Sequence, residues 1–301
     1  MTHGVTPAPV GNDAAVDGET ARRRGWGWVL LVPGMLYLAV FFVYPTIQLF
    51  LTSLYDPSGS YVQGYNLTWH FANYWNAIHD TWHQFARSLR YAGIATVICL
   101  VLSYPLAYAI AFKAGRWKNF MLVLVIAPFF TSFLLRTLSW RTILADQGPV
   151  ASFLRTLHVL PSDGRLLATS VAVVAGLVYN FMPFMTLPLF ASLDKVDHRL
   201  IEAAGDLYSS PFTGFRKVTL PLSLPGVVSG TLLTFIPACG DYINAELLGT
   251  PKQYMVGNRI QSAFLTEHNY PLAASLSLIL MFVVVLMVVF YVRRVGTERL
   301  V

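Results

Sequence analysis

The chain has 301 residues, of which 55% are hydrophobic and only 12% are charged. Soluble domains carry about 25% charged residues, so this composition excludes an ordinary soluble protein and indicates one embedded in a membrane. The net charge of +6 is better explained by the orientation of such a protein than by nucleic-acid binding, and we expect no nucleic-acid partner.

Six charge-free apolar runs are long enough to cross a bilayer, since a spanning helix needs roughly 17–25 residues. The third run is the shortest, at 17 residues, and we expect it to extend past Arg136 into the outer interface. The sequence therefore predicts an all-α, polytopic membrane protein with six transmembrane helices. The predicted spans are Gly25–Leu54, Tyr91–Phe112, Asn119–Leu135, Leu166–Leu193, Val218–Gly240 and Asn269–Val292.

Residues 1–24 contain Pro, Gly and Asp but almost no large apolar side chain, which predicts a disordered tail. The first span, residues 25–54, is too long for a cleaved signal peptide and lacks a small-residue cleavage site at its end. Six spans put both termini on one side. With Arg22–Arg24 inside, 13 of the 21 basic residues lie inside, so we predict cytoplasmic termini, including a tail at residues 293–301.

Residues 55–86 form a predicted external loop rich in Tyr, Trp, Asn and His, with an amphipathic helix from Trp75 to Arg87. His79 and His83 are four residues apart and share a helical face. Without a second pair of ligands, we interpret them as interfacial polar residues that contact a partner. We expect no metal site.

The second and third spans are joined by the short turn Lys113–Lys118, which predicts an antiparallel hairpin. Pro128 is expected to kink the third helix, because proline removes a backbone donor. The prolines and glycines of the fourth and fifth spans have two interpretations. They allow kinked packing, or they mark a pathway lined by irregular backbone, which is tolerated only where it is shielded from lipid.

A polar island of 33 residues, Asp194–Gly226, separates the fourth and fifth spans. Its first half predicts an amphipathic helix, and Ser210 and Pro211 are suited to the N-cap and first position of a second helix. The pairs Leu220-Pro221 and Leu224-Pro225 are expected to close that second helix. Two short surface helices with an outward apolar stripe predict a docking element, with an ordinary solvated loop as the alternative. The stripe is Leu193, Val196, Leu200, Ala204 and Leu207.

The ionisable residues closest to membrane depth are Asp241, Glu246 and Arg136. A charged residue near the bilayer centre raises the free energy of membrane insertion by about 2.5–3.5 kcal/mol, so its presence indicates a structural or functional role. Asp241 either lines a route for a cation or pairs with Arg136 or Arg141, and Glu246 lies nearer the rim. On a continuous helix the two carboxylates would be roughly 140° apart. They face one lumen only if the helix ends or kinks between them.

Four aromatic residues, Tyr179, Phe184, Tyr242 and Tyr254, are candidates for cation–π contacts with an ammonium group, with simple packing as the alternative. The chain has no Gly-x-x-x-x-Gly-Lys-Ser/Thr loop, so we expect it to bind no ATP and to have no catalytic residue. Cys99 and Cys239 lie in apolar runs and are predicted to be buried in helix packing.

Glu202-Ala203-Ala204, followed by Val218-x-Leu220-Pro221, resembles the EAA signature of ABC-importer permeases. The family's pattern has Gly where this chain has Tyr208, although Gly205 is nearby. Further stretches resemble permeases of the spermidine/putrescine type, over most of the chain from the first span onward. They are Phe129-x-Thr131-Ser132-x-Leu134-x-Arg136-Thr137, Gly176-Leu177-Val178-Tyr179-x-Phe181-x-Pro183-Phe184 and Phe235-Ile236-Pro237-Ala238-x-Gly240-Asp241-Tyr242.

The resemblance implies a type-I ABC importer permease fold, with a permease core at residues 86–292 and a cytoplasmic EAA coupling loop at residues 194–221. It implies coupling residues at Glu202, Ala203, Ala204, Gly205, Leu207, Leu220 and Pro221. It also implies a location in the bacterial inner membrane and, as partners, membrane lipid, a second homologous permease, two copies of an ABC ATPase and an extracytoplasmic solute-binding protein.

ATP and Mg would be used by the partner ATPase. The expected function is polyamine uptake by ATP-driven alternating access, with pathway candidates Asp241, Tyr242, Glu246, Tyr179, Phe184 and Arg136. Two alternatives stay open: import of another small solute (an amine, amino acid or anion), or a secondary transporter or channel that works alone.

Overall fold

The computed structural model describes residues 31–295 except 61, 159, 162, 208 and 209. The chain divides into two compact units, residues 1–52 and residues 53–301. The described residues are mostly helical and hold no β-strand, and residues 55–67 contain two isolated bridges, Tyr55 with Leu67 and Ser60 with Gly64. The all-α prediction is confirmed.

The described part of the first unit belongs to an apolar helix, Leu31–Ser53, which ends at the first residue of the second unit. A π-helical stretch, η1 (Ala39–Val43), precedes α2 (Tyr44–Ser53). It comes just before Pro45, whose missing N–H a wider turn accommodates. Large apolar side chains are exposed along this helix, which suits hydrocarbon surroundings. The predicted tail 1–24 and the start of the first span lie outside the described residues.

The second predicted span is the last part of a 41-residue helix, α3 (Ala72–Phe112). The amphipathic helix expected at Trp75–Arg87 is present, but it is not a separate element, because α3 runs through it without interruption. No Pro or Gly lies between Ala72 and Tyr91, so nothing in the sequence ends the helical hydrogen bonding there. The helix that opens the core predicted at 86–292 therefore begins at Ala72.

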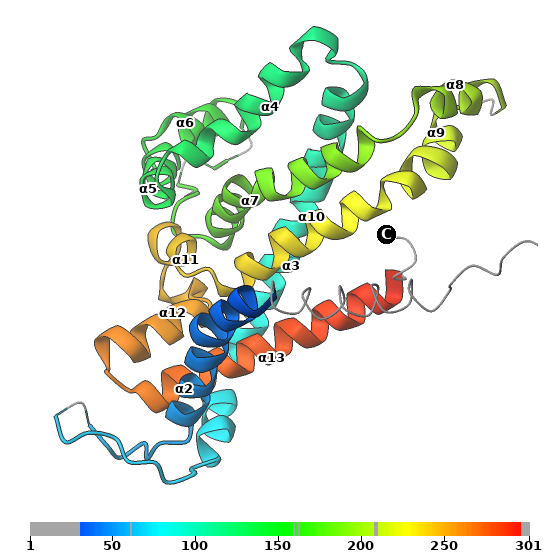
Figure 1. The fold of residues 1–301 in the computed structure, drawn as a ribbon. Coiled ribbons are helices and arrows are strands. Elements are labelled where there is room, and N and C mark those ends of the chain that lie inside the picture. The colour runs from blue at the N-terminus through cyan, green and yellow to red at the C-terminus, as the bar shows by residue number, and fades with distance from the viewer. Residues whose placement is uncertain (1–30, 61, 159, 162, 208–209, 296–301) are drawn as a thin grey trace, which may run out of the picture. The chain divides into compact units, whose positions relative to one another are not determined.

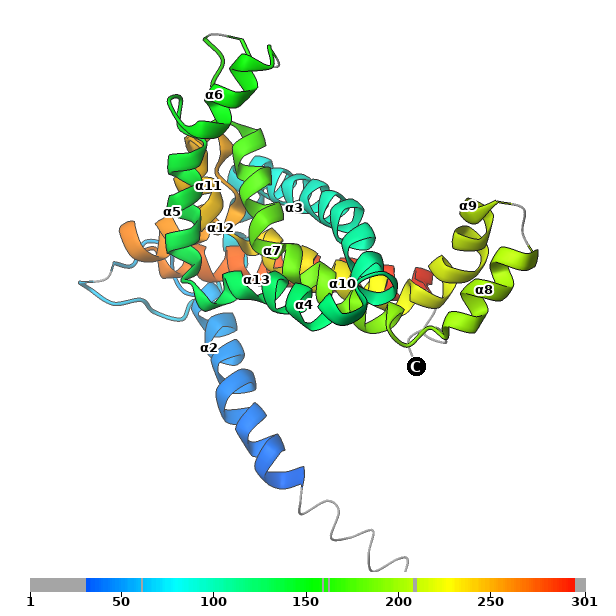
Figure 2. The same ribbon diagram turned by 90° about the horizontal axis from the view of Figure 1, so that it is seen from above.

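The third predicted span is broken. Helices η2 (Gly115–Trp117), α4 (Lys118–Ile126) and η3 (Ala127–Phe130) form one arm, and α5 (Phe133–Ile143) forms the other, at 95° to it. Thr131 and Ser132 are extended, with ψ of 143° and 136°. The bend falls at Thr131–Ser132, three residues beyond Pro128, which lies inside η3. The helix continues past Arg136 to Ile143, as expected, but only after this bend, so α5 leaves the direction of α4 (Figure 2).

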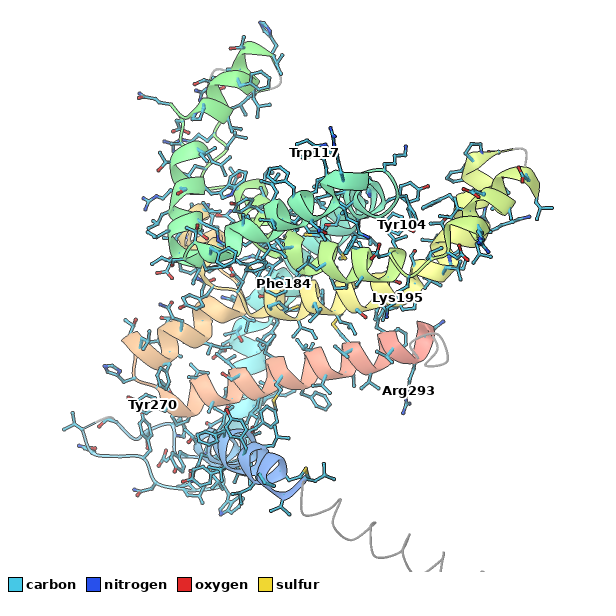
Figure 3. All side chains as sticks on the ribbon, turned by 45° about the horizontal axis from the view of Figure 1, so that its top comes forward. Tyr104, Trp117, Phe184, Lys195, Tyr270 and Arg293 are labelled. Atoms are coloured by element: carbon cyan, nitrogen blue, oxygen red, sulfur yellow. The ribbon has the colours of Figure 1, made fainter. Side chains whose placement is uncertain are left out.

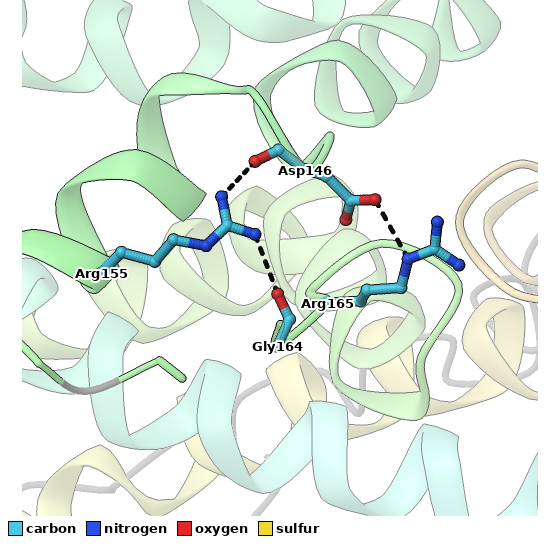
Figure 4. Close-up of polar contacts among 4 residues, drawn as sticks. All are labelled: Asp146, Arg155, Gly164 and Arg165. Atoms are coloured by element: carbon cyan, nitrogen blue, oxygen red, sulfur yellow. Dashed lines mark hydrogen bonds and ion pairs between the residues drawn. The ribbon is translucent and has the colours of Figure 1, made fainter. Parts of the chain in front are cut away.

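The connection after α5 is held by arginines. Helix α6 (Pro149–Thr156) carries Arg155, which donates to the backbone oxygens of Asp146 and Gly164. The side chain of Arg165 donates to the carboxylate of Asp146 over 3.0 Å (Figure 4). These contacts link the start of the segment that follows α5 to the residues just before α7 (Ser170–Leu193).

Helices α7, α3 and α10 (Leu220–Gly240) pack extensively against one another. A Cβ at Gly226 would lie 2.7 Å from the backbone oxygen of Pro188, and one at Gly230 would lie 3.0 Å from that of Met185. This small-xxx-small spacing lets α10 approach the backbone of α7. Hydrogen bonds reinforce the packing: Thr186 to Ser103 at 2.9 Å and Tyr104 with Ser223 at 2.7 Å. Both cysteines are fully buried, as predicted.

The polar island folds into α8 (His198–Leu207) and α9 (Pro211–Gly214). Ser210 is the N-cap residue of α9 and Pro211 its first residue, as predicted. The prolines at 221 and 225 do not end the second helix, however, because residues 211–240 are helical throughout. A π-helical stretch, η4 (Phe215–Thr219), directly precedes α10, and its wider turn accommodates the missing N–H of Pro221.

Beyond α10 the chain forms short elements: α11 (Ile243–Leu248), η5 (Pro251–Gln253), α12 (Val256–Gln261) and η6 (Ser262–Thr266). They lie at the end of α10 opposite to α8 and α9 (Figure 1). Helix α13 (Tyr270–Val295) then returns as the last span. Within the described residues, five helices are long and apolar enough to cross a membrane, and a sixth span results if the bent α4–α5 pair counts as one.

Candidate coupling and translocation sites

The α8–α9 pair is connected directly to α7 and α10, two helices that pack closely against each other. Residues 194–197 alone separate α7 from α8, and α9 is continuous with α10 through η4. Lys195 lies in this short link (Figure 3). Neighbouring Asp194 pairs with Lys118 at the start of α4, which ties that arm to the same end. The α8–α9 pair therefore follows α7 after a four-residue link and leads into α10 without a break in the helix.

The predicted stripe of the island divides into a buried and an exposed part. Val196 and Ala204 are buried, and Ala204 lies against Gly214 of α9, where an added Cβ would be 3.6 Å away. In contrast, Leu200 and Leu207 are 48% and 78% exposed, and Phe212 of α9 is 70% exposed. The pair thus presents large apolar side chains outward.

Among the other predicted coupling residues, Glu202, Ala203, Gly205 and Pro221 are exposed, whereas Leu220 is half-buried. An exposed carboxylate beside exposed apolar groups is a typical docking surface. The turn at Tyr208, where the family pattern has Gly, lies outside the described residues. A cavity of about 630 Å³ lies between α7, α10 and the start of α8, with Lys195 and Asp197 on its wall.

At the opposite end, α10 stops at Gly240 and α11 starts at Ile243, so the condition for Asp241 and Glu246 to share a space is met. Asp241 is only 8% exposed, and its Oδ1 accepts the backbone N–H of Asn244 over 2.9 Å. Glu246 and Tyr242 are exposed. Within the described residues no ion pair joins Asp241 to Arg136 or Arg141, so the predicted alternative of a structural ion pair is absent.

Arg136 is 7% exposed and lies within an aromatic cluster. Its guanidinium carbon is 5.5 Å from the ring centre of Phe129 and 5.7 Å from that of Phe133. Phe129 in turn packs edge-on against Phe184, with ring centres 5.1 Å apart. The Nε and Nη1 atoms of Arg136 are buried without a hydrogen-bond partner. The structure thus brings Arg136 and Phe184 together at the bend between α4 and α5.

Two predicted aromatic residues lie elsewhere. Tyr179 packs on Trp140, with ring centres 5.2 Å apart, and faces a groove next to α3. The backbone oxygen of Tyr254 accepts a hydrogen bond from Arg87 over 2.7 Å. Neither residue joins the Arg136–Phe184 cluster.

Sequence reasoning missed a buried amide network. The Nδ2 atom of Asn180 donates to Thr137 at 3.2 Å and to Asn244 at 3.1 Å, which links α7, α5 and α11. Gly176 makes room for it, because a Cβ there would lie 2.6 Å from Oδ1 of Asn244. Single asparagines inside apolar runs are the signal that could have revealed this network, since buried amides need partners.

Comparisons with known proteins agree with this geometry. Residues 97–299 match the family model of the binding-protein-dependent transport system inner membrane component. The chain belongs to this family. It is therefore a permease of the ABC importer class, and the resemblance seen in its sequence is confirmed.

Two relatives are similar over nearly the full chain. One is the spermidine/putrescine transport system permease protein PotB of Haemophilus influenzae, 36% identical over 258 residues, which cover 85% of this chain and 90% of the relative. The other is PotB of Escherichia coli, 34% identical over 267 residues, with 88% and 95% covered. The chain is homologous to these permeases.

Solved structures support the type-I importer fold. A bacterial ABC transporter involved in the import of the acidic polysaccharide alginate contains a chain of TM-score 0.67 and 15% identity, with 91% of this chain and 96% of that chain covered. The same class of transporter in complex with an alginate pentasaccharide-bound periplasmic protein gives a TM-score of 0.62. At this identity the likeness concerns the fold alone.

Proposed function

We propose that this chain is one permease subunit of a polyamine importer that works by ATP-driven alternating access. The observation that carries the proposal is the similarity to spermidine/putrescine permeases over about nine-tenths of their length. The assembly would contain a second homologous permease, two copies of an ABC ATPase and an extracytoplasmic solute-binding protein. Hydrolysis of ATP with Mg belongs to the ATPase.

The coupling step follows from the way the α8–α9 pair is connected. The ATPase grips the exposed face that includes Glu202, Leu207 and Phe212. Closure of the ATPases moves the pair, and the motion passes into α7 and α10 through the short link and the continuous helix. Gly226 and Gly230 keep α7 and α10 close enough to move as one body. This role places the α8–α9 pair and both termini in the cytoplasm.

The substrate contacts belong to the other end of the same helices. A polyamine must exchange its water for carboxylates or aromatic faces in a low-dielectric passage. Glu246 and Tyr242 are exposed there and meet the cation first. Asp241 is engaged in capping α11, so it becomes available to the cation when α11 moves. Phe184 contributes an aromatic face deeper in the passage.

Arg136 favours a second candidate within the same class, import of an anionic solute. Its buried Nε and Nη1 atoms have no hydrogen-bond partner, and an unpaired buried charge costs several kcal/mol. A carboxylate-bearing solute would satisfy it, whereas a polyamine would be repelled unless Arg136 turns away. A secondary transporter or channel acting alone is disfavoured, since it has no use for an ATPase-docking helix pair.

The experiment is purification of the intact complex in lipid nanodiscs, followed by measurement of its ATPase rate with binding protein loaded in turn with spermidine, putrescine or an acidic amino acid. Stimulation by the polyamine-loaded forms alone supports the proposal. Stimulation only by the acidic solute would replace it with the second candidate. Uptake by this chain without any ATPase would exclude both.

A further inference from the structure

A long apolar groove runs along α3 and α7, on the half of these helices away from the α8–α9 pair. We name it the outer groove and define it by Arg90, Ile98 and Leu102 of α3, Val174 and Met182 of α7, and Trp140 of α5. Its volume is about 840 Å³. Because the chain bends by 95° between η3 and α5, α5 contributes only Trp140 to the wall.

The dimensions of the outer groove match one leaflet of a bilayer. It extends over 13 residues on α3, from Arg90 to Leu102, and over 13 on α7, from Ser170 to Met182, which is 12 residue-to-residue steps on each helix. At about 1.5 Å per residue each wall is roughly 18 Å long, against about 15 Å for half of a 30 Å hydrocarbon core. The groove is therefore long enough to hold an acyl chain from the headgroup level to the middle of the membrane.

The mouth of the groove carries charged and polar groups, whereas its walls are apolar. Arg90 is exposed there, with its guanidinium carbon 5.6 Å from the ring centre of Tyr91. Across the described chain no carboxylate forms an ion pair with Arg90. The Tyr91 hydroxyl and Ser170 Oγ lie 2.6 Å apart and fasten the two walls together. Trp140 and Tyr179 pack on each other farther along α7, toward Met182, where they line the apolar wall.

We propose that the outer groove is a binding site for an anionic phospholipid, in the leaflet away from the α8–α9 pair. Arg90 holds the headgroup phosphate, and the acyl chain lies along Ile98, Leu102 and Met182. The site removes Tyr179 from the translocation pathway and makes it a lipid contact. It leaves the Arg136–Phe184 cluster, on the other part of α5 and α7, as the pathway side.

The test is native mass spectrometry of the purified intact complex, titrated with phosphatidylglycerol or with phosphatidylcholine of the same acyl chains. The wild type should show a saturable site with at least about tenfold preference for phosphatidylglycerol. Arg90→Gln should reduce the preference to twofold or less, and Arg90→Lys should restore most of it. Arg141→Gln, an exposed cation on α5 outside the groove, should leave the preference unchanged.

A second variant tests the apolar wall. Ala175→Trp fills the groove and should remove the saturable binding of both lipids, while the complex stays assembled. Equal affinity for the two lipids in the wild type, or an unchanged preference in Arg90→Gln, would overturn the proposal. So would displacement of the lipid by glycerol phosphate alone, or a disulfide from Ile98→Cys to another subunit.

Discussion

The two ends of the α7–α10 pair are built in opposite ways. At the α8–α9 end, large apolar side chains such as Leu207 and Phe212 face outward and await a partner. At the α11 end, Asp241, Asn180 and Asn244 are buried and bonded to one another or to the backbone. We call the first the gripped end, because a partner can bind its exposed apolar side chains. We call the second the hydrogen-bonded end, because its polar side chains already have partners within the chain.

The difference indicates that a partner exerts force on the gripped end and that the hydrogen-bonded end resists deformation. A rigid helix pair joins the two ends through the close contacts at Gly226 and Gly230. Movement at the gripped end must therefore strain the hydrogen-bonded end, where α11 meets α7 and α5. Substitutions at the two ends should separate these roles.

The largest effect is expected at the gripped end, for Glu202→Lys. If Glu202 meets a basic group of the ATPase, the variant brings like charges together, which costs several kcal/mol. Association with the ATPase should fall by roughly a hundredfold or more, and uptake with it. Co-purification measures the association, and membrane insertion should be normal. Asp163→Lys, an exposed charge reversal in the loop before α7, serves as the control. Full uptake by Glu202→Lys would refute the docking role.

The link between the ends is tested by Gly226→Ala. Its Cβ would lie 2.6 Å from Cβ of Ser192 and 2.7 Å from the Pro188 oxygen, so α10 must move away from α7. Overpacking of this kind costs about 1–3 kcal/mol, which should lower Tm and uncouple ATP hydrolysis from uptake. Gly93→Ala in α3 is the matched control, because nothing lies within 4 Å of its added Cβ. Equal Tm values for the two variants would contradict the close packing.

At the hydrogen-bonded end, Asp241→Asn keeps the size of the side chain and removes its charge. Charge-assisted hydrogen bonds exceed neutral ones by roughly 1 kcal/mol, so polyamine uptake should slow about fivefold. Because the structure shows no Asp241–Arg136 ion pair, Arg136→Gln should not rescue the variant. Uptake assays on both single variants and the double variant measure this. Rescue would restore the structural-pair interpretation and end the pathway role of Asp241.

The smallest expected effect is on the stability of the protein at acidic pH. The hydrogen bond from Arg259 holds the pKa of Glu267 below its ordinary value, in the loop before α13. A lowered pKa in the folded state stabilises the protein above the ordinary pKa, and this stabilisation is lost as pH falls through the folded pKa. The pair is partly exposed, so its loss below about pH 4 should cost under about 1 kcal/mol. Glu267→Gln should flatten that part of the Tm–pH curve, and an unchanged curve would contradict the contact.

Sequence predicted the gripped end better than the hydrogen-bonded end, for a physical reason. Amphipathic spacing and the Ser210-Pro211 start are local signals, readable within one turn of helix. The Asn180–Asn244 bond joins residues 64 positions apart and depends on the space left at Gly176, which no local pattern shows. The prediction that the prolines of α10 end the second helix failed in a similar way, because a π-helical stretch accommodates Pro221 without ending the helix.

The most direct test of the account is a cross-link at Leu207. In a chain with Cys99 and Cys239 replaced, Leu207→Cys should form a cross-link to the ATPase in the assembled complex. It should also be protected from an impermeant thiol reagent added to intact cells, whereas Ser60→Cys or Gln253→Cys should react. Labelling of Leu207→Cys from outside, with no cross-link to the ATPase, would contradict both the topology and the coupling role.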